Sequence, residues 1–127
     1  MPKTPVSSDR AWKASMPFPQ AVRCGDTLYV CSVGYKPGGA LEGPDIRSQT
    51  MRTLENIKAL VEAAGGTLKD VAKVTLYITE QGDFAAMNEV FWQYFPEDPP
   101  HRATVIVGLA TEGLKVEIDA IAYLAKG

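Results

Sequence analysis

The stretch QTMRTLENIKALVEAAGGTLKDVAKVTLYIT, residues 49–79, combines a helical pattern with a strand pattern. In its first half, apolar residues recur at intervals of three or four, which is typical of one face of an amphipathic helix: Met51, Leu54, Ile57, Leu60, Val61 and Ala64. The pair Gly65-Gly66 predicts the end of this helix, because glycine readily takes the left-handed backbone conformation of a C-cap. In the second half Val74, Leu76 and Ile78 alternate with polar residues, which predicts a half-buried strand.

Upstream of this stretch, Asp45 is a favourable N-cap for a helix that begins at Ile46. The segment QAVRCGDTLYVCSVG, residues 20–34, predicts a β-hairpin that turns at Gly25-Asp26. Residues 1–17 are polar and interrupted by prolines, which indicates an extended N-terminal arm. Whether this arm adds an edge strand stays open.

Downstream, Gly82-Asp83 is expected to cap a second helix, which Pro96 ends. The segments RATVIVGL, residues 102–109, and LKVEIDAIAYL, residues 114–124, flank ATEG, and together they predict a second hairpin. The order is hairpin, helix, strand, helix and hairpin. We therefore expect one α+β domain over residues 1–127, with a mixed sheet and two helices packed on one face of it.

The composition excludes several classes of function. The chain has 127 residues, 46% of them hydrophobic, and a formal net charge of −2, so neither a nucleic acid nor a membrane is an expected partner. The apolar runs are far shorter than a membrane span, and no secretory signal is evident. Cys24 and Cys31 are expected to be free thiols, which favours a cytoplasmic protein. A single histidine and no Cys-x-x-Cys pair argue against a zinc site.

The last strand pattern carries carboxylates on one face. Alternation puts Val116, Ile118, Ala120 and Ala122 on the face toward the helices, and Glu117, Asp119 and Ile121 on the opposite face. That second face also carries apolar residues. A partly apolar sheet face without a helix on it favours a second copy of the chain as its cover.

Arg102 has two interpretations from the residues alone. It is either an arginine at a strand end that water satisfies, or a receptor that binds a carboxylate through paired guanidinium donors. Thr104 projects to the same side of the strand. His101 is predicted to be a loop residue rather than a base, and Cys31 a buried small hydrophobic residue rather than a nucleophile.

Four segments together resemble the RidA/YjgF family of enamine/imine deaminases. They are PFPQAVRCGDTLYV, the stretch of residues 49–79, DFAAMNEVFWQYFP, and PPHRATVIVGL followed by KVEIDAIA. Their order and spacing match the family. The resemblance implies a chorismate-mutase-like fold that assembles as a homotrimer around a central barrel, with sites between subunits and no cofactor.

The resemblance also implies roles for particular residues. Arg102 holds the carboxylate of a small-molecule substrate, and Glu117 positions or activates the water that attacks the imine carbon. Substrates are 2-aminoacrylate-like or aminomuconate-like imines, and the products are a 2-keto acid and ammonia. Positional and general-base catalysis suffice, because an iminium carbon is already electrophilic.

The chain departs from the family pattern in residues expected to line the substrate site. Phe18 stands where a tyrosine is common, Cys31-Ser32-Val33 replaces Ser-Gly-Gln, and Thr104 replaces a cysteine. These differences imply either a different imine or an alternative function, a non-catalytic trimer that binds carboxylates or serves regulation. Members of the family are sometimes described as ribonucleases. The net negative charge of this chain argues against binding of RNA.

Overall fold

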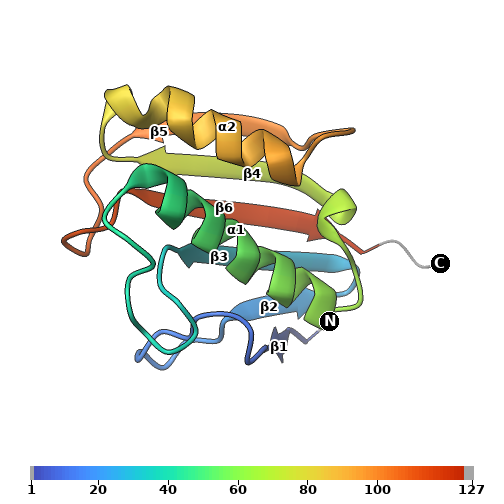
Figure 1. Cartoon of the computed structure of the whole chain (residues 1–127). Coiled ribbons are helices and arrows are strands. Elements are labelled where there is room, and N and C mark those ends of the chain that lie inside the picture. The colour runs from blue at the N-terminus through green and yellow to red at the C-terminus, as the bar shows by residue number, and fades with distance from the viewer. Residues whose placement is uncertain (1, 125–127) are drawn as a thin grey trace.

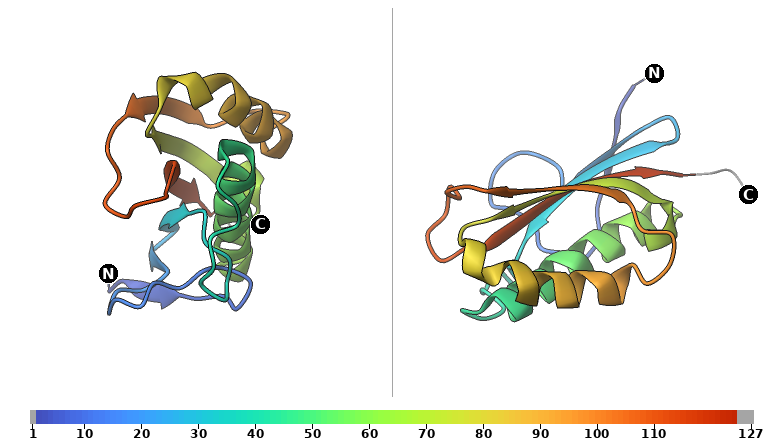
Figure 2. Two further views of the ribbon diagram at one scale, coloured as in Figure 1. Left: turned by 60° about the vertical axis from the view of Figure 1, so that its left-hand side comes forward. Right: turned by 90° about the horizontal axis from the view of Figure 1, so that it is seen from above.

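The computed structural model describes residues 2–124, which form a six-stranded sheet with two α-helices on one side (Figures 1 and 2). The predicted α+β architecture with both helices on one face is therefore confirmed. In chain order the elements are β1 (Thr4–Val6), β2 (Ala21–Cys24), β3 (Thr27–Val33), α1 (Ile46–Ala63), η1 (Leu68–Asp70), β4 (Val71–Ile78), η2 (Gln81–Asp83), α2 (Phe84–Tyr94), β5 (His101–Ile106) and β6 (Val116–Tyr123).

The strand order is β1-β2-β3-β6-β4-β5, which corrects one expectation. The first hairpin is confirmed, because β2 pairs antiparallel with β3 across the Gly25 turn. The prediction of a second hairpin, between residues 102–109 and 114–124, is wrong. Strand β5 runs parallel to β4 at the sheet edge, and β6 pairs antiparallel with both β3 and β4. The chain from β4 through α2 makes a crossover that returns in parallel, and β6 then occupies the centre of the sheet.

The hydrophobic core lies between the helices and one face of the sheet. Strand β6 alternates as predicted, with Val116, Ile118, Ala120 and Ala122 buried. The side chains that meet them from α1, including Leu54, Ile57 and Leu60, are almost completely buried. Among the helices of residues 2–124, none has the length and apolar character needed to cross a membrane.

The ends of α1 follow the sequence signals closely. The Asp45 carboxylate accepts a hydrogen bond from the Ser48 backbone N–H at 2.9 Å, as expected of an N-cap. At the other end Gly65 has φ 94°, and its N–H donates to the Glu62 carbonyl at 3.0 Å. Asp83 does not cap α2 with its side chain. Its carboxylate accepts a hydrogen bond from the Lys115 ammonium at 3.1 Å instead.

The face of the sheet opposite the helices is open (Figure 2). It carries large side chains that remain exposed, among them Tyr29 (49%) and Tyr123 (60%). Part of the N-terminal arm does add an edge strand, since β1 pairs antiparallel with β2. The arm then continues past Ala11, which is buried in the core.

Candidate functional site

Arg102 lies on the helix side of the sheet. It pairs with Val74 of β4, whose side chain is buried against the helices, so both residues project to that side. The guanidinium carbon lies 4.9 Å from the ring centre of Phe91 and 5.3 Å from that of Trp92, both on α2. Phe84 of the same helix lies at 5.7 Å. These rings attract the cation and restrict its position.

The polar contacts of Arg102 leave part of the guanidinium free to bind. Its Nε donates to the Thr104 hydroxyl at 3.0 Å, which is possible because residues 102 and 104 of β5 project to the same side. Its Nη1 is buried and has no hydrogen-bond partner within the described chain. Burial lowers the pKa of this guanidinium, although an arginine stays charged. A buried cationic donor without a partner has the chemistry needed to bind an anion.

A hollow of about 570 Å³ lies beside Thr104 at the edge of the sheet. Phe84, Ala85 and Ile106 give it mostly apolar walls, and Gln81 and Gly82 complete it. Thr104 contacts Arg102, and the Phe84 ring lies near the guanidinium. This hollow therefore adjoins Arg102.

Glu117 lies on the open face, in a different hollow of about 500 Å³. Its register partner on β4 is Tyr77, and its neighbour on β3 is Cys31, whose Sγ donates to Glu117 Oε2 at 3.2 Å. Asp119 lines the same hollow, and desolvation raises the pKa of its carboxyl, partly offset by Lys73. The remaining wall is the segment 107–110, which follows β5.

Cys31 is not a buried hydrophobic residue, which corrects the expectation for it. Cys31 alternates with the buried residues Val30 and Ser32 along β3, so its side chain lies on the open face, where the residue is exposed. The pKa of its thiol is nevertheless raised strongly, first by desolvation and then by the charge and hydrogen bond of Glu117. The thiol is therefore protonated at neutral pH, so it is a hydrogen-bond donor and a poor nucleophile.

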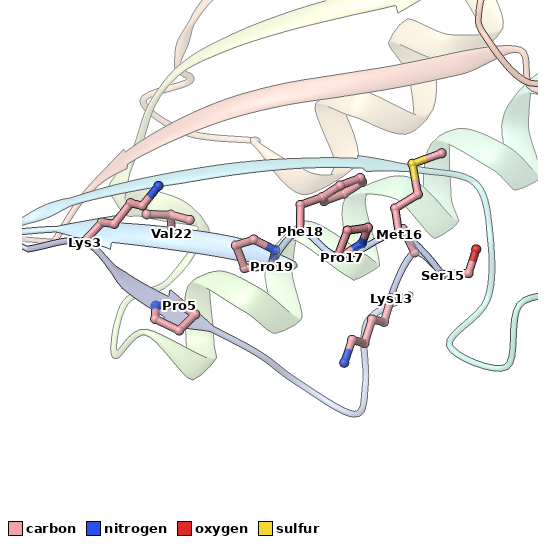
Figure 3. Close-up of a pocket in the computed structure, with 10 residues that line it drawn as sticks. Lys3, Pro5, Lys13, Ser15, Met16, Pro17, Phe18, Pro19 and Val22 are labelled. Atoms are coloured by element: carbon pink, nitrogen blue, oxygen red, sulfur yellow. The ribbon is translucent and has the colours of Figure 1, made fainter.

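Phe18 lies in a third hollow, of about 710 Å³, between the arm and β2 (Figure 3). Figure 3 shows Phe18 and Met16 extending from the segment 13–19, and Val22 of β2 beside Lys3 farther along the same hollow. Both side chains are largely exposed, Phe18 by 54% and Met16 by 63%. No hydroxyl is available at Phe18 to bind a polar ligand.

The predicted site residues thus form separate groups within one chain. Arg102 and Thr104 are together on the helix side, Glu117 and Cys31 are together on the open side, and Phe18 lies near the arm. Along β4, the partners of Arg102 and Glu117 are Val74 and Tyr77, three residues or about 10 Å apart. Because the two side chains also point to opposite faces, one chain cannot bring both onto one small molecule.

Asn56 of α1 is a positioning residue that the sequence patterns did not reveal. It is fully buried, and its amide nitrogen lies 3.1 Å from the Ser32 hydroxyl, 3.1 Å from the Val33 carbonyl and 2.9 Å from the Tyr35 carbonyl. Its amide oxygen accepts from the Trp12 backbone N–H at 3.3 Å. Asn56 therefore ties the end of β3, next to Cys31, to the N-terminal arm.

Other site residues were also missed, for an identifiable reason. Tyr77 shares the alternating pattern of β4, but only the strand order makes it the neighbour of Glu117. Phe91 and Trp92 are adjacent residues of α2. Their contact with Arg102 depends on β5 lying beneath that helix, which the helical pattern alone does not reveal. Within residues 2–124, no cluster of three or more His, Cys, Asp or Glu side chains could hold a metal ion.

Comparison with known proteins gives a consistent result. A family model described as Endoribonuclease L-PSP matches residues 8–124. A RutC family protein of Pyrococcus horikoshii is 42% identical over 124 residues, which cover 95% of this chain and 98% of that protein. A protein of Dermatophagoides farinae named 2-iminobutanoate/2-iminopropanoate deaminase is 33% identical over 126 residues, which cover 97% of this chain and 98% of that protein.

A solved structure agrees with this match. The crystal structure of E. coli TdcF with bound serine superposes with a TM-score of 0.90 at 34% identity. The superposition covers 96% of this chain and 99% of TdcF. The similarity therefore extends over the whole fold, including the strands that carry Arg102 and Glu117.

Proposed function

This chain belongs to the L-PSP endoribonuclease family, which includes the RidA, YjgF and RutC proteins, and from this premise we propose that it hydrolyses reactive imines that carry a carboxylate. The proposal rests above all on the buried, unpaired Nη1 of Arg102, which is a ready donor for a substrate carboxylate. The relative named 2-iminobutanoate/2-iminopropanoate deaminase supports the choice of an imine.

The proposed reaction needs water and no other reactant. The carboxylate of a 2-imino acid binds Arg102, and a water molecule attacks the imine carbon. The imine is protonated at nitrogen in water; the water oxygen bonds to the iminium carbon as the C=N π electrons move to nitrogen, and Glu117 accepts the proton that the water loses and then returns it to the nitrogen. The resulting carbinolamine expels ammonia and leaves a 2-keto acid. General-base assistance of this kind contributes about 10²–10⁴-fold.

The site needs two copies of the chain. Arg102 and Glu117 project from opposite faces of one sheet, so a substrate that contacts both must lie between copies. The exposed Tyr29, Val105 and Tyr123 on the open face supply apolar area for this association. We infer a homotrimer with sites at its interfaces, in which one copy contributes Arg102 and its neighbour contributes Glu117.

A small carboxylate fits this chain better than RNA does. The family description names an endoribonuclease, yet the net charge is −2 and the hollow that contains Glu117 also contains Asp119. A phosphate backbone would meet these carboxylates at close range and gain little from counterion release. Incubation with single-stranded RNA is therefore a control in which we expect no cleavage.

The first test is a coupled assay with two imines. A pyridoxal-phosphate lyase produces 2-aminoacrylate from serine or the corresponding enamine from threonine, and semicarbazide traps the imine that is not yet hydrolysed. We expect the protein to accelerate formation of the 2-keto acid and to lower the yield of semicarbazone. Equal product formation with and without protein, for both imines, would contradict the proposal.

A pair of matched variants tests the role of Glu117. Glu117→Gln keeps the shape of the side chain and removes the base, so we expect kcat/KM to fall about 10²-fold. Glu112→Gln makes the same change in the exposed loop before β6 and is expected to leave kcat/KM unchanged. Similar activity of the two variants would remove Glu117 from the reaction.

The second candidate function is a trimer that binds carboxylates without turnover. The observation in its favour is Phe18, which offers no hydroxyl where family members commonly have tyrosine. This candidate predicts that pyruvate raises the melting temperature of the protein while neither imine is consumed faster. Turnover of either imine excludes it.

A further inference from the structure

The Cys31 thiol and the Glu117 carboxylate form a contact that none of the family roles given above requires. They lie on adjacent antiparallel strands, β3 and β6, where Cys31 pairs with Asp119 and Glu117 pairs with Val33 (Figure 1). This diagonal arrangement puts the thiol beside the carboxylate on one face, and Sγ lies 3.2 Å from Oε2.

We propose that Cys31 is a positioning residue, whose thiol hydrogen bond holds the Glu117 carboxylate in the orientation that presents its other oxygen to the attacking water. This inference rests on the proposed function and extends it to a residue outside the family pattern. An ionised carboxylate can only accept hydrogen bonds, so the thiol must be the donor.

The surroundings of Cys31 keep the thiol in its donor form. Desolvation, the Glu117 carboxylate and, more weakly, Asp119 all raise its pKa. Other charged or titratable groups on the open face are Tyr77 and Lys73 of β4 and Tyr29, two residues before Cys31 on β3. Loss of the proton would leave a thiolate against a carboxylate, which these contacts oppose.

The hydrogen bond has a direct consequence for catalysis. A glutamate carboxylate rotates about three side-chain torsions, and the thiol fixes one of its oxygens to the neighbouring strand. With Oε2 engaged, Oε1 stays available for the water proton in a constant place. Orientation of reacting groups is a large part of the effect of such a site on rate.

The kinetic test compares two substitutions of Cys31. Cys31→Ala removes the donor, and we expect kcat/KM for the imine made from serine to fall about fivefold to tenfold, as for loss of one modest hydrogen bond to a charged group. Cys31→Ser restores a donor and is expected to recover wild-type kcat/KM within about twofold. The Kd for pyruvate should be the same in all three proteins, because Arg102 is unaltered.

A second measurement is independent of turnover. In a Cys24→Ser background, which leaves Cys31 as the only thiol, the rate of alkylation by iodoacetamide is followed from pH 7 to pH 10. Glu117→Gln removes the negative charge and replaces the carboxylate by a weaker, neutral amide acceptor, so we expect Cys31 to react at least about fivefold faster and at lower pH. Asp119→Asn is the matched control, and its effect should be smaller because Asp119 is the weakest of the causes.

The two measurements separate the possible failures. Equal kcat/KM in Cys31→Ala and wild type, with matching melting temperatures, would overturn the positioning role. Equal alkylation rates in Glu117→Gln and Asp119→Asn would also overturn it, because Glu117 would then have no special contact with the thiol. If no imine is hydrolysed by wild type, the proposed function fails, and the alkylation rates alone decide whether Cys31 holds Glu117.

Discussion

At the scale of single residues, the contacts of Arg102 hold its guanidinium in the position that the proposed function requires of an anion receptor. The rings of Phe91 and Trp92 on α2 contact its guanidinium, and the Thr104 hydroxyl accepts a hydrogen bond from its Nε–H. These contacts leave Nη1 without a partner in a buried place, where a hydrogen bond to a carboxylate is strong. The receptor therefore depends on the planar shape of the guanidinium as well as on its charge.

Replacing Arg102 by lysine tests this dependence on shape. An ammonium group cannot stack on two rings while donating to Thr104 and to both oxygens of a carboxylate. We expect Arg102→Lys to weaken pyruvate binding and kcat/KM at least about tenfold, as measured by calorimetry and the imine assay. Arg47→Lys is the control, because Arg47 makes an exposed ion pair with Glu89 and should change neither quantity. Retained affinity in Arg102→Lys would show that charge alone suffices.

Sequence patterns placed Arg102 on a strand but left its role open between a solvated strand end and a receptor. The deciding contacts come from α2, and they depend on which strand lies beside β5. Alternation within a single strand gives no information about its neighbour. The contact between Cys31 and Glu117 was beyond prediction for the same reason, because β3 and β6 are 86 residues apart at that point.

At the scale of elements, Asn56 fixes α1 to the strand that carries Cys31. Its amide NH2, with two N–H donors, lies within 3.1 Å of three acceptors near the end of β3, and its oxygen accepts from Trp12 and from Arg52 Nε at 3.3 Å. The contacts with Ser32 and Val33 are buried, so the Val33 carbonyl cannot turn to water in their place. Buried polar groups that lose such partners carry their full desolvation cost.

Substitution of Asn56 should therefore destabilise the whole domain. We expect Asn56→Ala to lower the free energy of unfolding by about 3 kcal/mol, measured by urea denaturation. Asn88→Ala is the matched control in α2, since the amide oxygen of Asn88 is buried without a hydrogen bond, and its loss should cost less than about 1 kcal/mol. Equal effects of the two substitutions would contradict the positioning role of Asn56.

Local signals predicted the elements well and their arrangement less well. The cap at Asp45, the stop at Gly65 and the alternation in β4 and β6 were all correct, because each depends on neighbours in sequence. The second hairpin was wrong, since a short polar connection between two strands does not require them to pair. The parallel partner of β5 follows from the crossover through α2, and periodicity carries no information about it.

At the scale of the whole molecule, the open face of the sheet is the surface on which the proposed association of copies depends. Large side chains remain exposed there, and Glu117 lies among them with Cys31 and Tyr77. Exposed apolar area of this kind favours association, and a second copy is the partner that is always present. The same face would then serve both assembly and catalysis.

Mixing two inactive variants tests whether each site is shared between copies. Arg102→Ala lacks the proposed carboxylate receptor and Glu117→Gln lacks the proposed base, so each protein alone should keep only about 1% of wild-type activity or less. When they are unfolded together and refolded in equal amounts, about a quarter of the sites of a closed ring should receive Arg102 from one chain and Glu117 from its neighbour. We expect about a quarter of wild-type activity in the imine assay, with the oligomeric state followed by light scattering.

Refolding each variant separately before mixing is the control, and it should give no recovery. If both residues acted from one chain, the mixture that was refolded together would stay as inactive as this control.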